Sequence, residues 1–207
     1  MPSPYDNFAK YYNGLFFGPW LNLYYKQSIK FIKKYVQDED SFLDVGCGTG
    51  AFLKQLNKVK NNLKFFGIDE SQGMIKVAQK RKFKNATFQI AKAESLPFEA
   101  TSFNFISSID SFASFDKEKF FNECKRILRP NGYLFINTIA IGKFKIFNKI
   151  LIILTKIFGL TENVHHISLR DIQKIAESKN FKLIEVESKG LPYSPFYKYW
   201  FIVFQIK

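Results

Sequence analysis

Short apolar runs alternate with longer amphipathic stretches along most of the chain. Each run has the length of a buried strand and ends at polar or turn-forming residues. The runs are the apolar residues that precede Asp44, then residues 63–68, 87–90, 103–108 and 133–138. Apolar residues at helical spacing mark three segments between them: residues 51–56, 71–80 and 116–127. This alternation predicts a mostly parallel, doubly wound sheet with its ligand at the carboxyl ends of the strands.

The two ends of the chain continue this pattern. Residues 22–36 place apolar residues among lysines and predict an amphipathic helix before the first strand. A helix over about residues 168–180 precedes two further apolar runs, Phe181–Glu187 and Tyr199–Ile206. The connection over residues 190–195 is too short for a crossover helix, so these two strands are expected to pair antiparallel.

Polar residues mark several ends of the expected helices. Ser71 is predicted to cap the helix that follows it, and Asp116 to begin the next one. Pro130 is expected to terminate that helix, and Asn131–Gly132 to form the turn into the following strand.

A glycine-rich loop joins the first strand to the next helix. The segment Phe42–Gly50 reads F-L-D-V-G-C-G-T-G. Its three glycines, Gly46, Gly48 and Gly50, permit positive φ and carry no Cβ, so a ligand can lie against backbone N–H groups. The helix that follows begins with amides that lack intrahelical partners and favour an anionic group. Glycine clusters also form ordinary tight turns, so this loop alone is a weak signal.

An acid at the end of the second strand strengthens the signal. Asp69 lies 23 positions after Gly46, close to the spacing of about 20 residues at which a carboxylate reaches a ribose held by such a loop. A dinucleotide is one alternative, because Gly46, Gly48 and Ala51 satisfy the relaxed fingerprint. Asp44 disfavours it, since an acid there would repel a pyrophosphate. S-adenosylmethionine fits better, with an ammonium for an acid, a carboxylate for the helix amides and a ribose for Asp69.

At this point the chain resembles the class I S-adenosylmethionine-dependent methyltransferases that act on small molecules, quinones and lipids. Leu43–Gly50 is similar to the first motif of that family, and Gly67–Ser71 with Met74 to its second-strand motif. Ala93–Phe98 resembles the family's loop after the third strand, which passes the adenine edge. Two further segments resemble the fourth strand and the helix, turn and fifth strand: Phe103–Ser108 and Arg126–Leu134.

The resemblance covers roughly residues 5–207 and implies the fold. We expect one domain over residues 1–207, with a Rossmann-like seven-stranded sheet, an antiparallel C-terminal strand and helices on both faces. It also implies S-adenosylmethionine as cofactor, S-adenosylhomocysteine as product, and a set of cofactor contacts. These are Asp44, Gly46, Cys47, Gly48, Gly50, Asp69, Glu70, Met74, Ala93, Glu94, Ser108 and Tyr12.

Two positions depart from the family pattern. Lys92 stands where members often carry an Asp that contacts the adenine amine, and an ammonium cannot accept from an amine. The backbone of Ala93 or the side chain of Glu94 is the expected substitute. Asn104 stands where an Asp is usual, at the start of the fourth strand, and we expect it to alter local structure more than chemistry.

The segments outside these motifs bear on the methyl acceptor. Residues 1–37 or so resemble a helical lid in which Tyr5 and Tyr12 line the site, although these aromatics could instead pack the N-terminus onto the core. An insertion over about residues 142–166 contains Lys143–Gly159, an apolar helical stripe with lysines beside it. The lysines interrupt it well short of the roughly 20 apolar residues of a membrane span. It could cap the acceptor pocket or lie on an anionic membrane surface and admit a lipophilic acceptor.

Methyl transfer from a sulfonium is an in-line displacement that needs alignment and exclusion of water. Candidate bases for a protonated acceptor are Asp110, just beyond the fourth strand, and His165 or His166 near the cap. Cys47 and Cys124 lack a metal-ligand spacing and are not expected to form a disulfide, so no metal and a reducing cytoplasm are expected. The first ten residues do not read as a signal peptide.

The charge of the chain leaves several partners open. The formal net charge is +13, but only 4 of the 31 basic residues are arginine, the residue favoured for bidentate base and phosphate recognition. Compositional bias of the genome, an anionic substrate and membrane attraction each account for such a lysine excess, while nucleic acid is a less expected partner. The sequence therefore predicts a cytoplasmic methyltransferase for a small or lipid-like acceptor, with peripheral membrane contact as an option. A non-catalytic cofactor-binding regulator and an RNA-directed methyltransferase are the alternatives.

Overall fold

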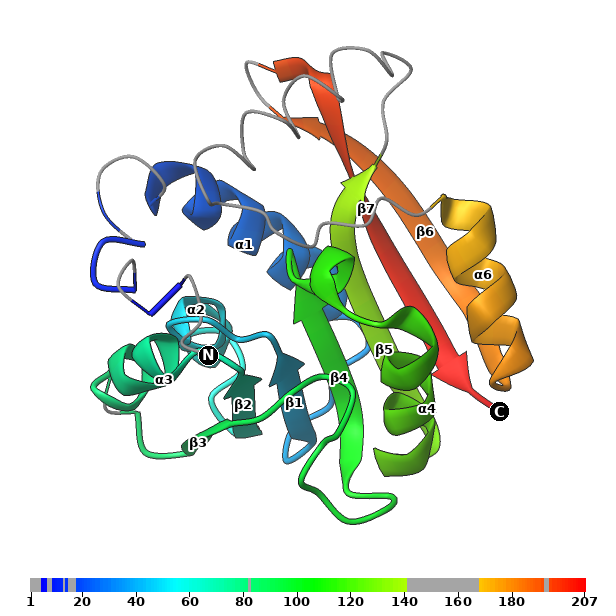
Figure 1. Cartoon of the computed structure of the whole chain (residues 1–207), viewed down its shortest axis with the longest axis horizontal. Coiled ribbons are helices and arrows are strands. Elements are labelled where there is room, and N and C mark those ends of the chain that lie inside the picture. The colour runs from blue at the N-terminus through cyan, green and yellow to red at the C-terminus, as the bar shows by residue number, and fades with distance from the viewer. Residues whose placement is uncertain are drawn as a thin grey trace.

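A seven-stranded sheet forms the centre of the molecule (Figure 1). The structure, a computed structural model, describes residues 5–6, 9–12, 14, 18–81, 83–140, 168–191 and 194–207. The strand order is β3-β2-β1-β4-β5-β7-β6. The strands are β1 (Ser41–Val45), β2 (Lys64–Asp69), β3 (Ala86–Ile90), β4 (Phe103–Ile109), β5 (Leu128–Ala140), β6 (Phe181–Leu191) and β7 (Ser194–Ile206).

The sheet is mostly parallel, as the alternating pattern predicts. Strands β1 to β5 pair with one another in parallel, whereas β7 pairs antiparallel with both β5 and β6. The expected seven-stranded architecture with an antiparallel C-terminal strand is therefore confirmed. The chain runs outward from β1 to β3 and then returns to β4 on the other side of β1, so a switch point lies between β1 and β4. Ligands of doubly wound folds bind at such a point.

Helices cover both faces of the sheet (Figure 1). They are α1 (Gly18–Ile32), α2 (Ala51–Asn57), α3 (Gln72–Gln79), α4 (Lys117–Ile127) and α6 (Leu169–Ser178), with a 3-10 turn η1 (Phe112–Ser114). Successive strand residues point to opposite faces. Phe42 joins the core beneath α1, α2 and α3, and its neighbour Leu43 joins the core beneath α4 and α6. Burial on both faces explains why the parallel strands read as nearly continuous apolar runs.

The predicted helix starts agree with the structure at three caps. Ser71 Oγ accepts from the amide of Met74 at 3.1 Å, and the Asp116 carboxylate accepts from the amide of Lys119 at 3.1 Å. Ser168 caps α6 in the same way. Each cap satisfies an amide that the first helical turn leaves without a partner.

Several boundaries differ from the prediction. The first helix ends at Ile32 and not at Val36, and the C-terminal strands extend to Leu191 and from Ser194, leaving almost no connection between them. The predicted turn at Asn131–Gly132 falls inside β5, because Leu128 already pairs with Phe103. The left-handed φ of 62° at Asn131 accompanies a register shift there.

Candidate functional site

A cavity of about 150 Å³, open to solvent, lies at the carboxyl ends of β1, β2 and β4. It is the place that the doubly wound topology predicts for a ligand. Eight of the twelve predicted cofactor contacts line it: Tyr12, Gly46, Gly48, Asp69, Glu70, Met74, Ala93 and Glu94. Tyr5 and the candidate base Asp110 line it as well. The other four, Asp44, Cys47, Gly50 and Ser108, lie outside the lining.

The glycine loop is fastened to the end of β2. The amides of Gly46 and Cys47 both donate to the carbonyl of Ile68 at 2.8 Å. Gly46, Gly48 and Gly50 have φ values of 75°, 51° and 70°, which residues with a Cβ rarely adopt. All three positions therefore have the left-handed backbone that the glycine spacing predicted.

The three glycines have different surroundings. A Cβ on Gly46 would lie 2.3 Å from Ser111 Oγ, and a Cβ on Gly50 would lie 2.9 Å from the ring of Phe88. A Cβ on Gly48 would have no protein atom within 4 Å. Gly46 and Gly50 therefore serve close packing, whereas Gly48 leaves room on the cavity side of the loop.

Ser111 is a site residue that the sequence analysis missed. It lines the cavity, and its hydroxyl donates to the carbonyl of Val45 at 3.2 Å, which ties the loop after β4 to the end of β1. Ser108 Oγ lies 3.4 Å from Ser111 Oγ, so Ser108 is buried behind this contact and does not face the cavity. A serine just beyond the fourth strand carries no local signal for such a contact.

Asp69 is held in place by two backbone amides. Its Oδ2 accepts from Gly48 at 2.8 Å and its Oδ1 from Ser71 at 2.9 Å. Burial raises the pKa of Asp69, while these two hydrogen bonds lower it in part. Each carboxylate oxygen keeps a lone pair for a further donor. The side chain can therefore accept from two neighbouring hydroxyl groups without rearranging.

Asp44 lies behind the loop, with 1% of its surface exposed. Ser107 Oγ donates to its Oδ1 at 2.6 Å. Burial raises the pKa of Asp44 to about 8, although the Ser107 hydrogen bond opposes this, and the charge of Asp69 adds to the rise. The carboxyl group is therefore largely protonated at neutral pH, which the position of Asp44 in the sequence did not reveal.

Asp110 projects from the end of β4 in a left-handed conformation, with φ at 62°. Its amide donates to the carbonyl of Asn137 at 3.0 Å. The side chain is exposed to the cavity, and the protein around the cavity removes enough water to raise the pKa of Asp110 to about 7. Burial is the largest cause of the raised pKa values of Tyr5 and Tyr12, and the charge of Asp110 raises them further.

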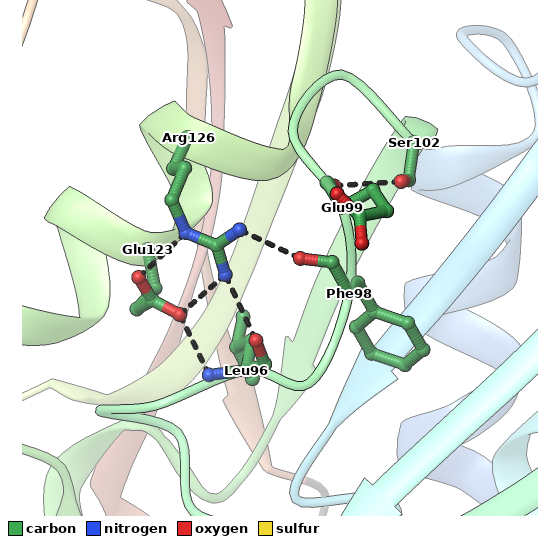
Figure 2. A network of polar contacts seen from close by, with 6 residues as sticks. All are labelled: Leu96, Phe98, Glu99, Ser102, Glu123 and Arg126. Atoms are coloured by element: carbon green, nitrogen blue, oxygen red, sulfur yellow. Dashed lines mark hydrogen bonds and ion pairs between the residues drawn. The ribbon is translucent and has the colours of Figure 1, made fainter.

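The loop after β3 is held by α4 at two places. Glu94 accepts from the amide of Asp116, the cap of α4, at 2.9 Å. Figure 2 shows the second place, where Arg126 and Glu123 reach from α4 to the loop. Arg126 donates to the carbonyls of Leu96 at 2.8 Å and Phe98 at 2.6 Å, and Glu123 accepts from the amide of Leu96 at 2.6 Å. These contacts fix the segment in which Ala93 and Glu94 face the cavity.

The two departures from the family pattern lie away from the cavity lining. Lys92 is exposed and pairs through its backbone with Ser95. Asn104 accepts through Oδ1 from the amide of Ser41 at 3.1 Å and from Arg129 at 3.3 Å, so it connects the start of β4 to the start of β1. Its contacts agree with the structural role expected for it.

The N-terminal segment is attached to the first turn of α3. Asp6 Oδ1 accepts from Ser71 Oγ at 2.7 Å and from the amide of Gly73 at 2.8 Å. A Cβ on Gly73 would lie 2.4 Å from the Asp6 carbonyl oxygen, so the two backbones approach closely. This attachment brings Tyr5 and Tyr12 to the cavity.

Three of the predictions fall outside the described residues: the cap insertion over residues 142–166 and the candidate bases His165 and His166. In the part of the chain that the structure describes, no group of His, Cys, Asp or Glu side chains is arranged to hold a metal ion. No helix within the described ranges combines the length and hydropathy needed to cross a membrane. Cys47 and Cys124 are both buried and free.

Comparison with known proteins agrees with this fold. The family model described as "Methyltransferase domain" matches residues 37–182, and the chain belongs to this family. A demethylmenaquinone methyltransferase of Thermotoga maritima is 34% identical over 98 residues, which are 47% of this chain and 42% of that protein. An uncharacterized protein of Methanocaldococcus jannaschii is 34% identical over 137 residues, 66% of this chain and 50% of that protein. The chain thus spans about half the length of these curated relatives.

Solved structures share the architecture. A SAM-dependent methyltransferase from Methanosarcina mazei superposes with a TM-score of 0.69 at 22% identity, covering 85% of this chain and 96% of that one. A geranyl diphosphate C-methyltransferase from Streptomyces coelicolor gives a TM-score of 0.71 at 13% identity, covering 88% and 79% of the two chains. At these identities the likeness establishes the fold.

Proposed function

We propose that this chain is an S-adenosylmethionine-dependent methyltransferase that acts on a small or lipid-like acceptor. The observation that carries the proposal is the Asp69 carboxylate, set by the amides of Gly48 and Ser71 at the edge of the cavity. A half-buried acceptor pair of this kind fits the hydroxyls of a ribose. Membership of the methyltransferase domain family supports the same cofactor.

The remaining walls fit the other parts of the cofactor. We assign the amino-acid portion to the glycine loop, whose residues Gly46 and Gly48 line the cavity. Adenine is assigned to the side formed by Met74, Ala93 and Glu94. Tyr12 covers the cavity from the N-terminal segment. Cys47, Gly50 and Ser108 then act as supports of the loop and not as contacts.

The protein's part in the reaction is to align the acceptor and keep water away. When bound, S-adenosylmethionine supplies an activated methyl group on a positively charged sulfur. Asp110 can accept a proton from an acceptor atom, because its carboxylate opens to the cavity and its pKa of about 7 lies near working pH. The acceptor class stays open at this level. The Thermotoga maritima relative is named a demethylmenaquinone methyltransferase, which supports a quinone as one candidate among small and lipid-like acceptors.

Binding calorimetry with Asp69→Ala tests the cofactor assignment. Loss of two hydrogen bonds to a charged group is expected to weaken binding of S-adenosylmethionine by roughly 10- to 100-fold. Asp38→Ala is the matched control, because Asp38 is an exposed acid that pairs with Lys60 at the surface. Unchanged affinity in Asp69→Ala, with the melting temperature preserved, contradicts the ribose assignment.

Transfer of a labelled methyl group tests the enzymatic part. Incubation with lipid extract, quinone precursors, small amines and RNA is expected to label an acceptor and release S-adenosylhomocysteine. Tight binding of the cofactor with no label in any fraction would instead support the non-catalytic regulator.

A further inference from the structure

We infer that the acceptor atom is the nitrogen of an amine, and that Asp110 is the catalytic residue that holds this nitrogen and removes its proton. The inference rests on the proposed function and names the acceptor class for the same cavity. Its basis is the position, conformation and surroundings of the Asp110 carboxylate.

Asp110 differs from Asp69 and Glu94 in its partners. Asp69 accepts two backbone hydrogen bonds, and Glu94 accepts one from Asp116. Glu70 is exposed beside Asp69 at the end of β2, on the side assigned to the ribose. Among the described residues, none donates a hydrogen bond to the side chain of Asp110. Its oxygens are therefore available to a ligand at the β4 side of the cavity.

The backbone at Asp110 is strained, which is informative about its role. A left-handed conformation costs a residue with a Cβ about 1–2 kcal/mol and persists where the surroundings enforce it. Here the hydrogen bond from the Asp110 amide to Asn137 holds it. Within the described ranges, two buried polar atoms near Asp110 have no hydrogen-bond partner: Asn137 Oδ1 and Tyr24 Oη. The chain thus keeps a carboxylate and other polar groups around the end of β4, although an apolar acceptor would need no polar partner there.

The charge of the cavity favours an amine over an anion. Its described lining contains four carboxylates, Asp69, Glu70, Glu94 and Asp110, and no lysine, arginine or histidine, although the chain carries a net charge of +13. A phenolate, carboxylate or phosphate at the reacting position would face this negative field. An ammonium would be attracted by it, and the rings of Tyr5, Tyr12 and Phe115 on the same walls also favour a cation.

The proton and electron balance is complete without a further reagent. An acceptor ammonium gives one proton to Asp110 and exposes the nitrogen lone pair. This lone pair forms the new N–C bond to the methyl group. The S–C bond breaks at the same time, and the electrons of the S–C bond remain on sulfur, which becomes a neutral thioether. The methylated product leaves as an ammonium, and Asp110 gives its proton to water before the next turnover. Tyr5, Tyr12, Tyr24 and Tyr25 surround Asp110 with raised pKa values, and stay neutral while Asp110 titrates.

The test compares amine and phenol probes in the wild-type chain and in two variants. Labelled methyl transfer to ethanolamine, spermidine and hexylamine is measured against hydroquinone and catechol. Asp110→Asn is expected to lower kcat for the amine at least ~100-fold, with the dissociation constant of S-adenosylmethionine unchanged. The wild-type kcat should rise with pH through about 7, the pKa of Asp110, and this rise should be absent in the variant.

Asp110→Gly keeps the test valid if the Asn variant folds poorly. Glycine adopts the left-handed conformation freely, so this variant is expected to be at least as stable as wild type and still inactive. Transfer only to the phenols, no transfer to any probe despite cofactor binding, or full amine activity in either variant overturns the inference alone. Failure of the wild-type chain to bind S-adenosylmethionine overturns the proposed function itself.

Discussion

The two walls of the cavity are built in different ways. On the wall formed by β1 and β2, the glycine loop is bonded to Ile68 and Asp69 is held by two amides. On the wall formed by the end of β4, Asp110 is fixed through its backbone alone, and its carboxylate has no donor among the described residues. The first wall is complete before a ligand arrives, whereas the second leaves its polar group to be satisfied by one.

This difference separates a constant ligand from a variable one. Groups that are already ordered lose little entropy on binding, so a wall of this kind suits a ligand of fixed chemistry. The wall at β4 depends on a few side chains that point into the cavity, and it can take a different acceptor when those side chains change. The following substitutions test whether the first wall is as rigid as its contacts indicate.

Gly46→Ala should have the largest effect. Its Cβ would overlap Ser111 Oγ at 2.3 Å, and the φ of 75° is unfavourable for alanine. Overpacking and the left-handed conformation together are expected to lower the free energy of unfolding by ~2–5 kcal/mol. Urea denaturation measures this loss.

Gly48→Ala is the matched control. It has a similar positive φ but no protein atom within 4 Å of the new Cβ, so only the conformational cost of ~1–2 kcal/mol is expected. Because that Cβ would enter the cavity, affinity for S-adenosylmethionine should fall more than stability does. Equal losses of stability in the two variants would show that the contact with Ser111 does not hold the loop.

Asp44 makes the stability of the first wall depend on pH. Folding raises its pKa from 3.8 to about 8, so the folded protein binds more protons than the unfolded chain between these values. The stabilisation is full below pH 4 and is lost as pH rises through 8, by up to ~1.4 kcal/mol per pH unit. Melting temperatures of the ligand-free protein should fall from pH 6 to pH 9, and less steeply in Asp44→Asn.

Asp110→Asn controls for another carboxyl with a raised pKa, since the pKa of Asp110 is about 7 and its share of the slope ends at lower pH. Parallel curves for wild type and Asp44→Asn would mean that Asp44 is already ionised in the fold.

Arg126→Ala should have the smallest effect. It removes the hydrogen bonds to the carbonyls of Leu96 and Phe98 that α4 makes with the loop after β3. Arg126 is 39% exposed, so water replaces part of the loss, and about 1 kcal/mol of stability is expected. Affinity for S-adenosylmethionine should fall a few-fold, as measured by calorimetry. In Lys119→Ala, which breaks an exposed pair at 3.7 Å, neither quantity should change measurably.

Local signals made much of this structure predictable. The glycine spacing and the capping residues Ser71 and Asp116 act within a few residues of the chain, and they agree with the observed elements. Asp69 lies only 23 positions after Gly46 and ends β2, where the sequence placed it. The antiparallel pairing of the last two strands followed from the shortness of their connection.

What could not be predicted depends on contacts between distant segments. Ser111 bonds to Val45 across 66 positions, and Arg126 holds Leu96 across 30. The protonation of Asp44 depends on its complete burial and on Ser107, 63 positions away. Periodicity carries no information on such pairs, so the sequence identified the cofactor loop but not the residues that brace it.

The attachment of the N-terminal segment has one more consequence. Ser71 serves two carboxylates at once: its amide donates to Asp69 and its hydroxyl to Asp6, 65 positions earlier in the chain. A shift of Ser71 would therefore displace both the N-terminal segment at Asp6 and the Asp69 carboxylate assigned to the ribose. The attachment of the N-terminal segment and the placement of the Asp69 carboxylate therefore both depend on one residue.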